Sequence, residues 1–277
     1  MTNFTLIFRN LIKKDWKKLS LSLIGLVYFA VFYAPMMSNI YSTKAELLAM
    51  FETLKNPAMI ALVGPTEATA QTVTMASFYF QEMTLFTALI FIIVSILHVL
   101  SRTRAEEEEG LSELVLSFPV GKLTQPVAVL LEMTGFYLTS GALITAGLSL
   151  VTQASNGFSL TTNALYGFSL ALSGLLFSAL ALLIAQLFAT ASTARNVTFS
   201  LLGALYIARA FTDLSNLTLS RLNPLAWVYL SSPAIGNHGL YLLATLLLVG
   251  CLLLVALYFQ NRRDISGIIF SGQATHH

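Results

Sequence analysis

The residues best suited to chemistry are concentrated in one short segment, residues 101–122. This segment carries five of the chain's 13 acidic residues, and four of them are consecutive, from Glu106 to Glu109. Paired carboxylates can exchange protons or bind a metal ion, but successive residues of a helix point roughly 100° apart. Four consecutive glutamates therefore cannot converge on one site. They suit either an ordinary solvated helix end or a surface on which a partner docks.

No other pattern in the sequence predicts a catalytic, cofactor-binding or metal site. The nearest match to a phosphate-binding loop, at residues 121–124, lacks the glycine spacing that wraps backbone amides around a phosphate. A single cysteine, Cys251, provides neither a disulfide nor a thiolate metal site. The histidines do not form a spaced ligand set; they are His98, His238, His276 and His277. We therefore expect no catalytic residue, cofactor or metal ion in this chain.

Charged residues inside or beside apolar stretches include Glu132, Arg209 and Asp213. Glu132 falls about six residues into an apolar run, where an ionisable side chain is a functional candidate by default. A glutamate so close to the membrane interface can also snorkel or pair with a neighbour. Arg209 and Asp213 are four residues apart and share a helix face, which predicts a structural ion pair.

The composition indicates a membrane protein. Hydrophobic residues make up 56% of the 277 residues and charged residues only 10%, whereas a soluble domain carries roughly 25% charge. A soluble chain of this size could not bury so much apolar surface in one core. The net charge of +2 is small, and no basic patch is interleaved with aromatic residues, so we expect no nucleic-acid partner.

A helix needs about 20 apolar residues to cross the hydrocarbon layer. Six such spans are predicted, at residues 19–37, 79–99, 127–151, 164–188, 197–211 and 240–259. The predicted fold is an all-α integral membrane protein with one transmembrane domain over residues 1–277. Small residues in the third and fourth spans, such as Gly141 and Gly174, should let these helices approach closely. With both termini inside, 11 of the 15 basic residues fall in cytoplasmic segments, which favours that orientation.

Three segments outside the spans have patterns of their own. Residues 1–18 place apolar side chains opposite a row of lysines, which predicts an amphipathic helix on the inner membrane surface. This helix would serve only as an anchor that sets the topology, or it would also contact a cytoplasmic partner. Residues 38–78 should contain an amphipathic helix from Lys44 to Leu62, ended by Gly64 and Pro65. Residues 213–238 are too apolar for a free loop and too broken for a span, so we expect them to re-enter the outer leaflet against protein.

Several strings occur in an order that is typical of one family. They are Pro57…Leu62-Val63-Gly64-Pro65, Thr103-Arg104-Ala105-Glu106-Glu107…Gly110…Glu113-Leu114…Pro119-Val120, Arg209…Asp213, Asn223-Pro224-Leu225-Ala226-Trp227 and Arg262-Arg263-Asp264. Over nearly the whole chain this set resembles ABC type-2 exporter permeases, closest to the polyketide-antibiotic exporter branch. The chain has Leu111 where the family commonly has an arginine, and it has one glutamate box where family chains usually have two similar halves. It looks like one half, either natural or truncated.

The resemblance implies a permease subunit of an ATP-driven exporter in the cytoplasmic membrane of a bacterium or archaeon. Such a subunit moves a hydrophobic or amphiphilic compound (an antibiotic, a drug or a lipid-like molecule) outward. ATP and Mg would bind to a separate nucleotide-binding subunit, and a second copy or a paralogous half would supply further spans. Residues 101–122 would be the coupling segment that seats in the ATPase. The implied coupling residues are Arg102, Arg104, Glu106, Glu107, Glu109 and Glu113.

Two other functions remain open at the level of sequence. A proton- or ion-coupled carrier could use Glu132 as its titrating group, but the internal repeats typical of such carriers are not visible. An intramembrane enzyme would need polar residues that converge at depth, and the spans supply too few of them.

Overall fold

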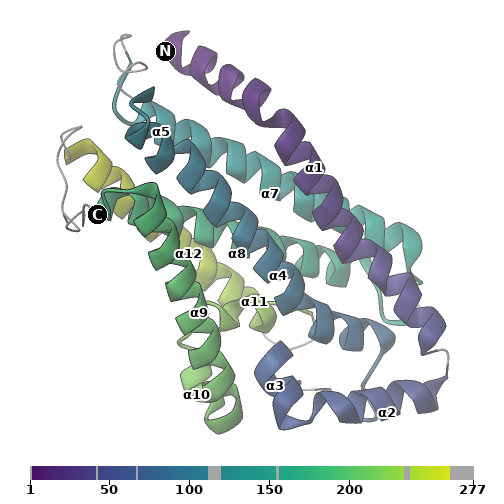
Figure 1. Cartoon of the computed structure of the whole chain (residues 1–277). Helices are drawn as coiled ribbons and strands as arrows, with labels where there is room; N and C mark the ends of the chain where they lie inside the picture. The colour runs from purple at the N-terminus through teal and green to yellow at the C-terminus, as the bar shows by residue number, and fades with distance from the viewer. Residues whose placement is uncertain are drawn as a thin grey trace, which may run out of the picture.

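The computed structural model describes residues 2–41, 43–66, 68–111, 120–153, 156–233 and 238–262. In these ranges the regular elements are helices, and six are long and apolar enough to cross a membrane. They run alongside one another (Figure 1). These six are α1 (Thr2–Ile40), α4 (Met75–Arg102), α7 (Thr124–Val151), α8 (Leu160–Leu187), α9 (Ala191–Ser215) and α12 (His238–Arg262). The prediction of an all-α protein with six membrane-spanning helices is confirmed.

The helix α1 is longer than the sequence analysis expected. Residues 1–18 and 19–37 were predicted as a surface helix and a separate span, but Thr2 to Ile40 form one continuous helix. No glycine or proline occurs before Gly25, so nothing in the sequence ends a helix in this region. At 1.5 Å per residue α1 is roughly 58 Å long, about twice the thickness of the hydrocarbon layer. Part of α1 must therefore lie outside that layer.

Helix α8 is the centre of the bundle and contacts α4, α7 and α12. It approaches α7 closely at Gly141 and Gly167, because a Cβ atom built on Gly167 would lie 2.6 Å from the carbonyl oxygen of Gly141. A Cβ atom on Gly174 would lie 2.4 Å from the ring of Tyr137. Only glycine fits at such contacts, and close backbone packing is a main source of helix association in lipid.

The span predicted at residues 197–211 is the middle of a 25-residue helix, α9. The predicted span begins after Arg195 and Asn196 because both residues are polar. Neither residue breaks a helix, so α9 begins earlier than the apolar stretch does. Thr190 caps the helix, since its side chain accepts a hydrogen bond from the backbone N–H of Thr193 at 3.2 Å.

The helix predicted from Lys44 to Leu62 is wrong, because the structure has two helices there. They are α2 (Lys44–Leu54) and α3 (Pro57–Val63), and α2 lies across the end of the bundle (Figure 1). Proline has no N–H and would clash within a continuing helix, but it fits the first position of a new one. Asn56 caps α3 with a 2.9 Å hydrogen bond from the N–H of Ala58.

Residues 213–233 form the end of α9 and two short helices, α10 (Leu217–Ser220) and α11 (Ala226–Leu230). Helix α11 is buried against α4, α8 and α12. The leucines around α10 are exposed, among them Leu219 and Leu222. Protein thus covers the second part of this segment and leaves the first part open, while residues 234–237 lie outside the described residues.

Candidate functional site

An ion-pair network joins α1, α4 and α5 (Arg104–Glu108), at the end of the bundle where the chain begins (Figure 1). The Nε atom of Arg102 donates to Oδ2 of Asp15 at 2.7 Å, and its Nη2 atom donates to the other carboxylate oxygen. The Nη1 atom of Arg102 donates to Oε1 of Glu106 at 2.9 Å, and Lys14 Nζ donates to the same oxygen at 2.9 Å. Charge-assisted bonds of this kind are the stronger hydrogen bonds in proteins, so α1 is tied firmly to α4 and α5.

The same segment is bound to α7 and to the link between α8 and α9. Gln125 of α7 donates to Oε2 of Glu106 at 2.8 Å. Arg104 Nε donates to the carbonyl oxygen of Ala189 at 2.7 Å, and the N–H of Ala191, at the start of α9, donates to Glu108 at 2.9 Å. These bonds satisfy backbone groups at helix ends that would otherwise lack partners. Residues 102–108 therefore connect α1, α7, α9 and the link between α8 and α9, and we call this set of contacts the ionic hub.

The sequence-predicted coupling residues fall into two groups in the structure. The side chains of Arg102, Arg104, Glu106 and Glu107 are only 12–20% exposed and bind within the chain. Glu109, by contrast, is exposed. The consecutive glutamates point in different directions, as helix geometry requires. Glu106 contacts α1 and α7, Glu107 contacts Arg104 of α5, and Glu108 contacts the start of α9. Glu113 and the other residues of 112–119 lie outside the described residues.

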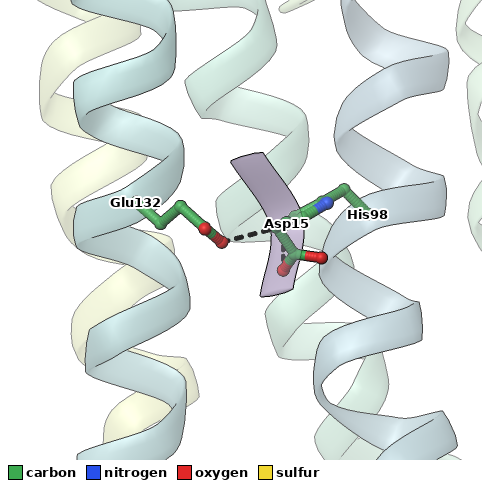
Figure 2. A group of neighbouring side chains, drawn as sticks. All are labelled: Asp15, His98 and Glu132. Carbon is green, nitrogen blue, oxygen red and sulfur yellow. Dashed lines mark hydrogen bonds and ion pairs between the residues drawn. The ribbon is translucent and has the colours of Figure 1, made fainter. Parts of the chain in front are cut away.

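A buried cluster of three ionisable residues lies next to the ionic hub (Figure 2). His98 on α4 faces both Asp15 on α1 and Glu132 on α7, and the three side chains are at most 4% exposed. The Nε2 atom of His98 is 3.0 Å from Oε2 of Glu132 and 3.8 Å from Oδ2 of Asp15. His98 and Arg102 are one helical turn apart and face the same way, so both reach Asp15. Glu132, predicted as a functional candidate or a paired residue, is therefore both buried and paired.

One ligand atom from each residue of this cluster lies within 4.8 Å of the others, a spacing that a metal ion could bridge. However, both carboxylate oxygens of Asp15 already accept hydrogen bonds from Arg102. A dication here would be repelled by the guanidinium and would compete with it for Asp15. The donor set therefore suits an ion-pair network better than a metal centre.

Neither Asp15 nor His98 was predicted as a functional residue from the sequence. Asp15 continues the apolar stripe formed by Phe8, Leu11 and Leu19 along α1. An acidic residue on the packed stripe of an amphipathic helix was the signal that could have identified it. His98 gives no such signal, since its partners lie on two other helices.

A second buried cluster, at the opposite end of the bundle, centres on Arg209 and Asp213. Arg209 Nη1 donates to Oδ2 of Asp213 at 2.7 Å, and neither side chain has measurable exposure. Arg209 Nη2 also donates to the carbonyl oxygens of Ala61 and Leu62, at 2.5 and 3.3 Å. The guanidinium therefore fastens α3 to α9.

Tyr229 completes this cluster from α11. Its hydroxyl donates to Oδ1 of Asp213 at 2.6 Å. Burial, together with the negative charge of Asp213, raises the pKa of Tyr229 well above its ordinary value, so the hydroxyl stays protonated and remains a donor. The Tyr229 ring also lies against Gly64, where a Cβ atom would be 3.2 Å from the ring and where φ is +94°. Two of the family-like strings, 57–65 and 209–213, thus meet in one structural clamp, which Tyr229 completes.

Comparison with known proteins supplies the remaining evidence on identity. No family model matches the chain. The chain is 30% identical, over 245 residues and 88% of its length, to the multidrug efflux system permease protein Rv1217c of Mycobacterium tuberculosis, and it spans 43% of that relative's own length. The match confirms the resemblance to exporter permeases: the chain is a multi-pass protein of the cytoplasmic membrane, similar over most of its length to part of a multidrug efflux permease and consistent with one half of an ABC type-2 permease.

Proposed function

We propose that the chain is the transmembrane subunit of an ATP-driven exporter that moves hydrophobic or amphiphilic compounds outward. The observation that carries the proposal is the match to a multidrug efflux permease over 88% of the chain. ATP and Mg would bind to a separate nucleotide-binding subunit. A second copy or a paralogous half would complete the set of spans, and α9 and α12 have large exposed apolar side chains, such as Phe211 and Leu254, that it could cover.

The ionic hub provides a physical route by which an ATPase could act on the spans. A partner that displaces α5 also displaces Arg102 and Arg104, which are bonded to Asp15 on α1 and to the α8–α9 link at Ala189. Because these contacts are charge-assisted and largely shielded from water, they resist stretching more than exposed ion pairs do. In this proposal the closure of the ATPase moves α1, α8 and α9 together.

The division of the glutamates into bonded and exposed residues reduces the candidates for direct contact with the ATPase. Glu106 is bonded within the ionic hub and Glu107 pairs with Arg104, so replacing either would disturb the permease itself. Glu109 is exposed next to them, and we assign it the direct contact with the ATPase. Charged side chains at such a surface fix register and the choice of partner.

The test is copurification of the ATPase with tagged full-length chain from native membranes, followed by mass spectrometry. We expect a nucleotide-binding subunit to be recovered with the wild type and to be lost or strongly depleted with Glu109→Lys. Glu52→Lys is the matched control, because Glu52 is also an exposed glutamate but lies on α2, at the other end of the bundle. Equal recovery with both variants would refute the role of Glu109. Absence of any ATP-binding protein with the stable wild type would refute the exporter assignment.

A further inference from the structure

A groove of about 300 Å³ lies between α1 and α7. Its walls are apolar, formed by Phe8, Ile12 and Trp16 on one side and by Leu131 and Phe136 on the other. Trp16 is 55% exposed and Leu131 is 47% exposed, so the groove opens at the protein surface. Its volume is at the lower end of the range for small-molecule sites, which is about 300–1,000 Å³.

Glu132 is the one charged residue among the described residues that line this groove. Its side chain is 4% exposed, and its Oε2 atom faces Nε2 of His98 at 3.0 Å. The other carboxylate oxygen, Oε1, is buried and has no hydrogen-bond partner in the described structure. A buried carboxylate is costly unless its charge and its lone pairs are satisfied, so this oxygen is a vacant acceptor.

The nearby cations are committed to other carboxylates. Arg102 is shared between Asp15 and Glu106, and Lys14 binds Glu106 as well. Three carboxylates therefore face two permanent positive charges. A proton within the cluster, or a cationic ligand in the groove, would supply the missing positive charge.

We propose that this groove binds an amphiphilic organic cation. The positive centre would lie beside Oε1 of Glu132, and the apolar body would lie against Trp16 and Phe136, whose ring faces also attract cations. The inference names a substrate class for the exporter and so rests on the proposed function. Binding itself requires only this chain, which allows the two ideas to be tested separately.

The test is equilibrium dialysis of radiolabelled tetraphenylphosphonium against purified full-length chain in nanodiscs of zwitterionic lipid, with empty nanodiscs as background. Tetraphenylborate, which has the same shape and the opposite charge, is the ligand control. We expect saturable binding of the cation only. Glu132→Gln should weaken it by about tenfold or more, as expected for the loss of one charge-assisted contact.

A second variant tests the groove without altering the charged cluster. Gly135 lines the groove, and a Cβ atom added to it would have no heavy atom within 4 Å, so Gly135→Leu would fill the space that the ligand needs. Gly203→Leu is the matched control, because Gly203 on α9 has equally open surroundings. We expect Gly135→Leu to reduce binding of the cation and Gly203→Leu to leave it unchanged. If Glu132→Gln does not fold, this comparison alone tests whether the cation binds in the groove.

The inference is overturned if tetraphenylborate binds as well as the cation, or if the wild type shows no saturable binding. Unchanged binding in both Glu132→Gln and Gly135→Leu would also overturn it. Recovery of an ATPase without cation binding would overturn this inference alone. Cation binding without any ATPase partner would overturn the proposed function and leave the groove assignment standing.

Discussion

The buried pair of Arg209 and Asp213 leads to a stability prediction with a definite magnitude. Asp213→Asn keeps the shape of the side chain and removes its charge, which leaves the Arg209 guanidinium as an uncompensated buried cation. Both side chains have no measurable exposure and are 2.7 Å apart. Breaking a buried pair by removing one partner costs about 3–5 kcal/mol. Arg209 keeps its bonds to two carbonyl oxygens of α3, so we expect a loss of about 3 kcal/mol in the free energy of unfolding.

The pair of Glu52 and Lys55 is the matched control. Its atoms are 2.6 Å apart, but the side chains are 61% and 42% exposed. Exposed pairs contribute about 0–1 kcal/mol, so Glu52→Gln should have little effect. The N···O distances of the two pairs are similar, so the comparison sets a buried ion pair against an exposed one.

Equilibrium unfolding of purified chain in mixed micelles, driven by sodium dodecyl sulfate and followed by circular dichroism, measures both changes. A double variant, Arg209→Met with Asp213→Asn, should lose less stability than the sum of the single variants, because each single change strands the other partner. If Asp213→Asn costs no more than Glu52→Gln, the clamp does not stabilise the fold and the reasoning is refuted.

Four further predictions concern single positions. Gly64→Ala should cost about 1–3 kcal/mol in the same unfolding assay, because φ is +94° and ψ is 168° at this residue, a backbone conformation that essentially only glycine adopts. A neutral result would contradict this reasoning. Gly167→Ala should destabilise by about 1–3 kcal/mol through overpacking against α7, whereas Gly203→Ala should be neutral. Tyr229 contributes fully to stability below about pH 10, its pKa in the unfolded chain. Because its pKa in the folded chain is higher, the contribution declines as the pH rises above about 10 toward that raised pKa. Unfolding measured from about pH 8 to 11 should therefore show a smaller loss of stability at alkaline pH for Tyr229→Phe than for the wild type. Asp15→Asn should cost about 3 kcal/mol and speed hydrogen exchange in the first half of α1; unchanged exchange would contradict the link from α1 to α4.

The spans could be predicted from the sequence because hydrophobicity over about 20 residues is a local property. The Arg209–Asp213 pair could be predicted for a similar reason, since both residues lie on one helix. The break at Pro57 is also readable from the sequence, because proline lacks an N–H, although the amphipathic pattern continues on both sides of it. In each case the deciding information lies within one continuous segment of the chain.

The buried cluster could not be predicted from spacing, because Asp15, His98 and Glu132 come from three helices whose packing is set by the whole bundle. The division of the coupling residues depends on packing in the same way. Glu106 and Glu109 are equivalent in the sequence, and only the positions of α1 and α7 make one bonded and the other exposed.

The central claim is that this chain works as the permease of an ATP-driven exporter, and transport into inside-out vesicles tests it most directly. Vesicles from cells with and without the chain would be given a panel of labelled amphiphilic compounds, with or without ATP, after a protonophore has collapsed the proton gradient. We predict uptake of at least one compound that requires both the chain and ATP and that vanadate inhibits. Uptake that requires the chain, proceeds without nucleotide and follows an imposed proton gradient would contradict the account.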